Sequence, residues 1–98
     1  MKRKNKNIGE YRKELIEVFS KTREEKALLR EFMIDILTPA EFDDLALRWQ
    51  LVKRLNKGET HRAVAGELRL GVGTVMRGAR ELRNKKGGFN LMLKKLGQ

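Results

Sequence analysis

The sequence predicts an all-α protein of about six short helices, and three observations support this prediction. Apolar residues recur at intervals of three and four in several stretches of the 98-residue chain, which is the spacing of one helix face. Two Thr-x-x-Glu segments have the form of a helix capping box, and the only proline suits a first helical turn. The length predicts one domain, and a hydrophobic content of 40% allows a modest core that a second copy would help to complete.

The first two helices follow from apolar stripes. Residues 9 to about 21 place Tyr11, Leu15, Val18 and Phe19 on one side of a helix. Thr22 and Glu25 then form a Thr-x-x-Glu segment, which predicts the start of a second helix. Its apolar face would consist of Leu28, Phe32, Met33, Ile36 and Leu37.

The clearest helix start is Thr38-Pro39-Ala40-Glu41. Thr38 suits the N-cap, Pro39 the first helical position, and Glu41 completes a second capping box. The third helix keeps its 3.6-residue period through Leu55, and Gly58 is expected to end it in a left-handed conformation. We interpret Trp49, within that period, as a core residue rather than a stacking platform for a ligand.

Residues 60–83 have the pattern of a helix-turn-helix. Thr60 is the expected cap of a fourth helix, and a fifth begins near Val72. The inward faces would be formed by Val64, Ala65, Leu68, Val75, Ala79 and Leu82. Arg69 occupies the turn position that usually holds a left-handed glycine, at a cost of about 1 kcal/mol. We therefore expect the turn to shift toward Gly71 or to lengthen.

A glycine in the middle of the fifth helix, Gly78, needs a reason. It costs about 1 kcal/mol relative to alanine, so we expect either close packing against a partner backbone or room for a small ligand. After the loop that follows Arg83, Phe89, Met92, Leu93 and Leu96 predict a short amphipathic sixth helix that folds onto the core or onto another subunit.

Positive charge is concentrated at the two ends of the chain. Residues 1–7 have a net charge of +4, residues 8–59 of −1 and residues 60–98 of +7, within a total of +10. Such segregation favours a polyanion as partner, because neutralised phosphates release counterions; a basic surface kept only for solubility is the alternative. We expect residues 1–7 to be a basic disordered arm and residues 8–98 a single helical domain for DNA binding and dimerisation.

The charge and the helix-turn-helix register together predict double-stranded DNA as the partner, although two-helix hairpins also occur in folds that never bind DNA. Base recognition is assigned to the start of the fifth helix, at Val72, Gly73, Thr74 and Met76. Phosphate contacts are assigned to Arg62, Arg69, Arg80, Arg83 and Lys85, and His61 is expected to face DNA or solvent.

Other classes of protein fit the sequence less well. The chain has no cysteine and one histidine, and its carboxylates lie mostly at helix starts and solvent faces, so we predict no enzyme, no metal site and no cofactor. No apolar run follows the basic N-terminus, so we expect a cytoplasmic protein without a signal peptide. An RNA-binding or nucleoid-associated protein is a weaker alternative because aromatic stacking residues are few.

The chain resembles the Trp repressor family of bacterial helix-turn-helix regulators, and in its tail a Trp-repressor-like branch of small regulators. The likeness lies in the following residues, in this order: Leu37-Thr38-Pro39-x-Glu41, Arg48, Val52, Gly58-Glu59, Glu67-Leu68, Thr74-Val75-Met76-Arg77-Gly78 and Leu82. The resemblance implies an intertwined homodimer with two helix-turn-helix heads that bind an operator. It also implies a small-molecule corepressor, such as L-tryptophan, beneath the fifth helix.

The resemblance assigns the residues of that ligand site. Arg48 and Arg77 would sandwich the ring while one of them binds the carboxylate, and Gly78 would lie against the ring. The set implied by the family is Leu37, Thr38, Arg48, Val52, Arg77, Gly78 and Glu81. Glu81 departs from the family's small hydroxyl residue. It would either pair with an ammonium group of the ligand or form an ion pair with Arg77 four residues earlier. The alternative function is a regulator that needs no corepressor or uses a different one.

Overall fold

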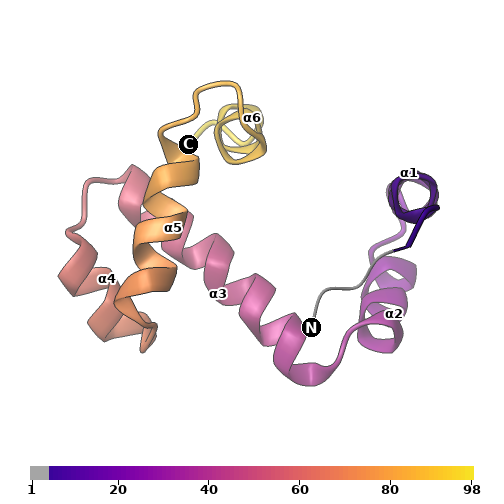
Figure 1. Cartoon of the computed structure of the whole chain (residues 1–98), viewed down its shortest axis with the longest axis horizontal. Coiled ribbons are helices and arrows are strands. Elements are labelled where there is room, and N and C mark those ends of the chain that lie inside the picture. The colour runs from indigo at the N-terminus through magenta and orange to yellow at the C-terminus, as the bar shows by residue number, and fades with distance from the viewer. Residues whose placement is uncertain (1–4) are drawn as a thin grey trace. The chain divides into compact units, whose positions relative to one another are not determined.

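The computed structural model describes residues 5–98, which divide into two compact units: the first ends at Pro39 and the second is Ala40–Gln98. The described residues contain six α-helices and no strand, which confirms the predicted fold class (Figure 1). The helices are α1 (Ile8–Ser20), α2 (Lys26–Ile36), α3 (Pro39–Asn56), α4 (His61–Leu68), α5 (Val72–Leu82) and α6 (Gly88–Lys95). Most of the predicted basic arm, residues 1–4, lies outside the described residues.

In the N-terminal unit, α1 and α2 meet through aromatic side chains. The rings of Phe19 and Phe32 pack edge to face, with centroids 5.3 Å apart. The predicted capping box at Thr22 is wrong, because α2 begins only at Lys26 and no side chain caps it. Thr22 is instead buried, and its hydroxyl donates to the carbonyl oxygen of Phe19 at 2.7 Å, so it closes the end of α1.

α3 begins at Pro39 and ends before Gly58, which has the predicted left-handed conformation with φ of 93°. The end of α3 is tied to α4 by charges that the sequence pattern does not reveal. The Arg54 guanidinium forms ion pairs with Glu59, at 3.4 Å, and with Glu67 on α4. These pairs link the end of α3 to the residue before the cap of α4 and to the last turn of α4.

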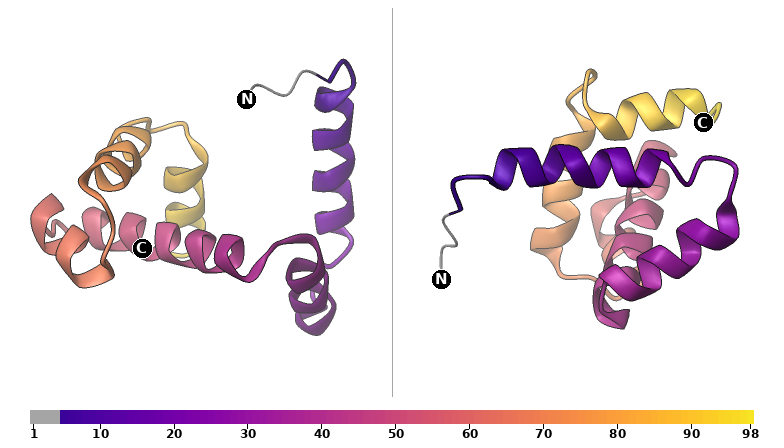
Figure 2. Two further views of the ribbon diagram at one scale, coloured as in Figure 1. Left: turned by 60° about the horizontal axis from the view of Figure 1, so that its bottom comes forward. Right: turned by 90° about the vertical axis from the view of Figure 1, so that its right-hand side faces the viewer.

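The core of the C-terminal unit joins α3, α4 and α5. Leu51, Val64 and Val75 are buried together, and half-buried residues pack around them: Leu55, Ala65, Leu68 and Leu70. Figures 1 and 2 show α5 lying over α3, between α4 and α6. Thr60 caps α4 as predicted, accepting a hydrogen bond from the Ala63 N–H at 3.1 Å. Trp49, predicted to be a core residue, is half-buried in this unit.

The turn between α4 and α5 contradicts one expectation. Arg69 itself takes the left-handed conformation, with φ of 54° and ψ of 46°, whereas Gly71 is extended. The backbone N–H groups of Arg69 and Leu70 both donate to the Ala65 carbonyl, which closes α4. Leu70 thereby packs on the core, and this packing offsets the strain at Arg69.

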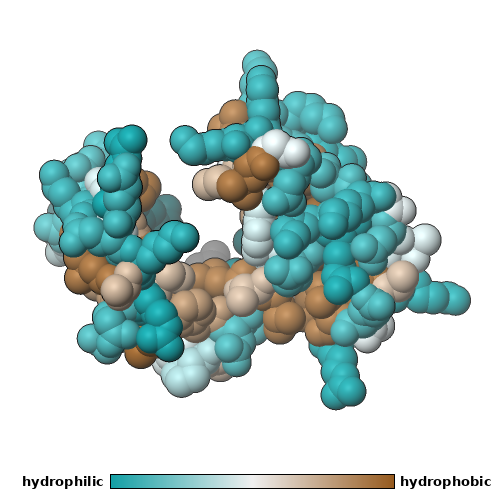
Figure 3. All heavy atoms as spheres, turned by 180° about the vertical axis from the view of Figure 1, so that it is seen from behind, coloured by the Kyte–Doolittle hydropathy of each residue, from teal (hydrophilic) through white to brown (hydrophobic). Residues whose placement is uncertain are grey.

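α6 is fixed to the end of α5 by one amide. Asn90 Nδ2 donates to the carbonyl oxygens of Leu82, at 2.7 Å, and Asn84, at 2.9 Å, and Leu93 is buried. Large apolar side chains nevertheless remain exposed along several helices, and hydrophobic residues reach the surface on the face shown in Figure 3. They include Tyr11, Leu15, Ile16, Leu28, Ile34, Leu45, Met92 and Leu96.

Replacing Arg69 with glycine should relieve the strained turn. We expect Arg69→Gly to raise the free energy of unfolding by about 0.5–1 kcal/mol, because glycine adopts the left-handed conformation without a Cβ clash. Urea unfolding at fixed protein concentration would measure it. Gly58→Ala is the matched control and should destabilise, since Gly58 has a positive φ. A loss of stability in Arg69→Gly would contradict this account of the turn.

Candidate nucleic-acid interface and ligand cavity

The two predicted sites lie on different faces of α5. Its buried face consists of Val75, Gly78 and Ala79, which pack toward α3 and α4. The remaining residues of the helix are exposed or half-buried and divide into two sides. One side bears Val72, Met76 and Arg80, each four residues after the last, and the other faces a cavity.

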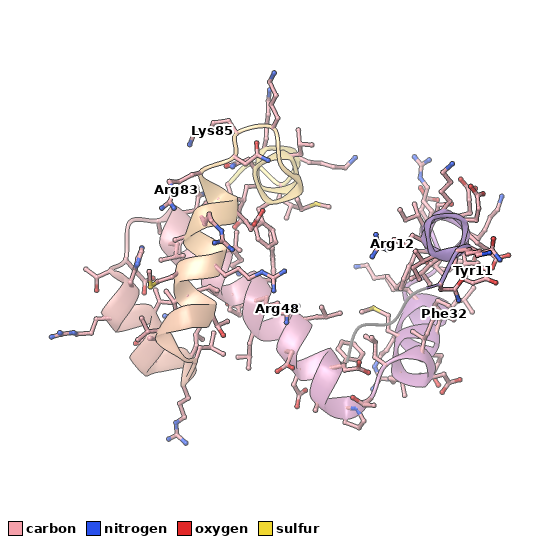
Figure 4. All side chains as sticks on the ribbon, in the orientation of Figure 1. Tyr11, Arg12, Phe32, Arg48, Arg83 and Lys85 are labelled. Atoms are coloured by element: carbon pink, nitrogen blue, oxygen red, sulfur yellow. The ribbon has the colours of Figure 1, made fainter. Side chains whose placement is uncertain are left out.

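All residues predicted to contact DNA are exposed. They are His61, Arg62, Arg69, Val72, Gly73, Thr74, Met76, Arg80, Arg83 and Lys85. They do not form a single group. Arg69, Val72, Gly73, Thr74 and Met76 lie at the turn and the start of α5, Arg80 follows two helical turns after Val72, and Arg62 lies at the start of α4. His61, Arg83 and Lys85 line a shallow groove of about 570 Å³ at the other end of α5. Arg83 and Lys85 are labelled there in Figure 4.

The packing of the fold does not require glycine at the start of α5. A Cβ built at Gly71 or Gly73 would meet no atom within 4 Å, and neither glycine has a positive φ. Gly73 nevertheless lies inside a helix, where glycine is about 1 kcal/mol less favourable than alanine. The packing of the chain therefore gives no reason for glycine at these two positions.

A cavity of about 160 Å³ lies between α3, α5 and the start of α6. It brings together five of the residues assigned to the ligand site: Arg48, Val52, Arg77, Gly78 and Glu81. Arg48 extends from α3 (Figure 4). Three further residues line the cavity: Leu51, Thr74 and Phe89. Thr74 was assigned to base recognition from the sequence, and the structure places it in the cavity wall.

Leu37 and Thr38 belong to the N-terminal unit, whereas the residues that line this cavity belong to the C-terminal unit. Their assignment to the ligand site rests on the resemblance alone and stays a prediction.

Gly78 has a packing role. A Cβ at this position would lie 2.7 Å from Cδ2 of Leu51 and 3.3 Å from its Cγ. Leu51 is 1% exposed and belongs to the core, so its side chain has little space to move. The contact is with a side chain of α3 rather than with a partner backbone. The missing side chain therefore lets α5 lie close to α3 and leaves Gly78 in the cavity wall.

The charged groups of the cavity are not neutralised by one another. Two guanidinium groups, of Arg48 and Arg77, and the Glu81 carboxylate line it. Within residues 5–98, no ion pair joins the Glu81 carboxylate to Arg77 or to Arg48. The cavity thus offers both positive and negative partners to a ligand.

Other kinds of site are not found in the part of the chain that the structure describes. No group of three histidine or acidic side chains is placed to hold a metal ion. Each described helix is too short or too polar to cross a bilayer.

Comparison with known proteins agrees with the resemblance seen in the motifs. The family model described as Trp repressor protein matches residues 11–97. This range begins within α1 and contains all of the other five helices. No curated protein and no solved structure matches the chain.

Two glycine substitutions on α5 should have opposite effects. We expect Gly78→Ala to lower the free energy of unfolding by about 1 kcal/mol, since overpacking against Leu51 outweighs the gain in helix propensity. Gly73→Ala should raise it by up to about 1 kcal/mol, because its Cβ meets nothing. Urea denaturation of both variants tests the pair. If both were stabilised, the close contact with Leu51 would not explain Gly78.

Proposed function

Because the chain belongs to the Trp repressor family, a family of DNA-binding transcriptional regulators, we propose that it is a cytoplasmic repressor that binds a duplex operator as a homodimer. The observation that most supports this is α5: a basic, exposed helix with a small and apolar start, held against α4 by a buried core. Two such helices in a dimer would enter successive major grooves about one turn apart.

The exposed apolar side chains support the dimer. α1 has no buried residue although Tyr11, Leu15 and Val18 follow one stripe, and α2 has none either. Amphipathic helices of this length need a partner for their apolar faces. A second copy of the chain would supply it.

The cavity supports control by a small molecule. A ligand with a carboxylate and a ring would contact the guanidinium groups of Arg48 and Arg77, and an ammonium group would pair with Glu81. L-tryptophan has all three features. Since Thr74, Arg77 and Glu81 project from α5 itself, such a ligand would fix the position of the recognition helix. A regulator with a different effector, or with none, is the alternative.

DNA binding should depend strongly on salt. We expect the purified protein to enrich specific duplexes from a random pool, with affinity that falls linearly on a log–log plot against salt. Arg80→Ala should reduce the slope by about 2, one phosphate contact in each half of the dimer. Arg30→Ala, which removes an exposed arginine paired with Glu31 on α2, is the control and should leave the slope unchanged. Equal affinity for all duplexes at every salt concentration would refute the proposed repressor.

Calorimetry with L-tryptophan tests the effector. We expect binding heat and a severalfold tighter operator complex, and Arg77→Ala should weaken the ligand by about 10- to 100-fold through loss of a charge-assisted hydrogen bond. Heat that appears only in Glu81→Ser would show that the cavity is a ligand site for a molecule other than tryptophan. If wild type and Glu81→Ser both gave no heat while the operator was bound, control by tryptophan would be excluded.

A further inference from the structure

We propose that Val72 and Met76 read the methyl groups of thymines in the operator, so that apolar contact specifies part of each half-site. This inference rests on the proposed function and adds to it which base is recognised, and how. Val72 is 64% exposed and Met76 57% exposed, although both belong to a helix with a well-packed opposite face. Their exposure leaves a row of apolar surface at the start of α5.

The chemistry of the row selects the thymine methyl. Neither side chain has a hydrogen-bonding group that can match a base edge as amides and guanidinium groups do. In the major groove, the C5-methyl group of thymine is the apolar group that distinguishes one base pair from another. Contact with it removes apolar surface from water on both sides, which is favourable.

The surroundings of the row favour DNA over another protein. Arg80 follows Met76 at the next turn, and Arg83 lies on the same side of the helix, so the apolar row continues into positive charge. A second copy of this surface would be repelled, whereas phosphates are attracted. Beside the row, the open space at Gly71 and Gly73 lets the backbone of α5 approach the base edges closely.

The geometry also limits where the thymines lie. Residues four apart on a helix are separated by about 6 Å along its axis, and base pairs by about 3.4 Å. The two thymines read by one helix should therefore lie within about two or three base pairs of each other. The dimer should repeat them in the second half-site with two-fold symmetry.

Uracil substitution tests the inference directly, because uracil differs from thymine only in lacking the methyl group. The wild-type protein is first used to select its preferred duplexes from a random pool. Each thymine of the selected site is then replaced singly by uracil, and the dissociation constant is measured. We expect about a fourfold loss of affinity at each contacted methyl, which corresponds to about 0.8 kcal/mol, and none elsewhere.

Variants of Met76 and Val72 test which side chain contacts which thymine methyl group. Met76→Leu keeps an apolar side chain and should keep the uracil effect, whereas Met76→Gln has similar length and similar helix propensity but should abolish it at one thymine. Val72→Ala should abolish it at the other. The loss of affinity caused by the side-chain substitution and the loss caused by uracil should thus be non-additive at the thymine that this side chain contacts.

The outcomes separate this inference from the proposed function. If no duplex is enriched, sequence-specific DNA binding itself fails. If a site is enriched and no uracil substitution weakens binding, or if the uracil effect persists unchanged in Met76→Gln and Val72→Ala, the repressor stands and methyl recognition by these residues is refuted.

Discussion

The close approach of α5 to α3 at Gly78 is the constraint on which the site depends. Gly78 faces the buried side chain of Leu51, and the missing Cβ lets the two helices meet where any larger residue would separate them. This contact fixes the depth of α5 in the unit. The same contact therefore determines both the exposure of the apolar row of Val72 and Met76 and the width of the cavity on the other side of the helix. A change at the contact acts on both faces, because a packed core transmits a shift rather than absorbing it.

The helices could be predicted from the sequence because their signals are local. The apolar periods and the segments at Pro39, Gly58 and Thr60 specify starts and ends within a few residues, and the structure has them there. Thr22 misled the prediction for an equally local reason. A threonine hydroxyl can donate to a preceding carbonyl as well as accept from a following N–H, and here it donates to Phe19. The pattern Thr-x-x-Glu does not distinguish the two.

The parts of the site that could not be predicted depend on contacts between distant residues. The left-handed Arg69 is tolerated because Leu70 reaches the core, and that packing is not encoded in the turn itself. Leu51 and Phe89 enter the cavity wall from α3 and α6, and only the tertiary arrangement brings them to Arg77. The motif likeness identified five of the cavity residues, since family motifs record tertiary proximity that spacing alone does not. The ligand, the partner copy and the operator lie outside a single chain and remain proposals.

The turn and the start of α5 have an evolutionary consequence. Arg69 and Gly73 are two of the positions at which the helix pair holds a residue less favourable for folding than a common alternative, and both lie on the surface proposed to face DNA. Selection for thermal stability alone would replace them, and the resulting lineage would keep its core while losing the proposed contact with its operator. Homologues that keep both the left-handed Arg69 and Gly73 would therefore be those in which DNA binding is still under selection.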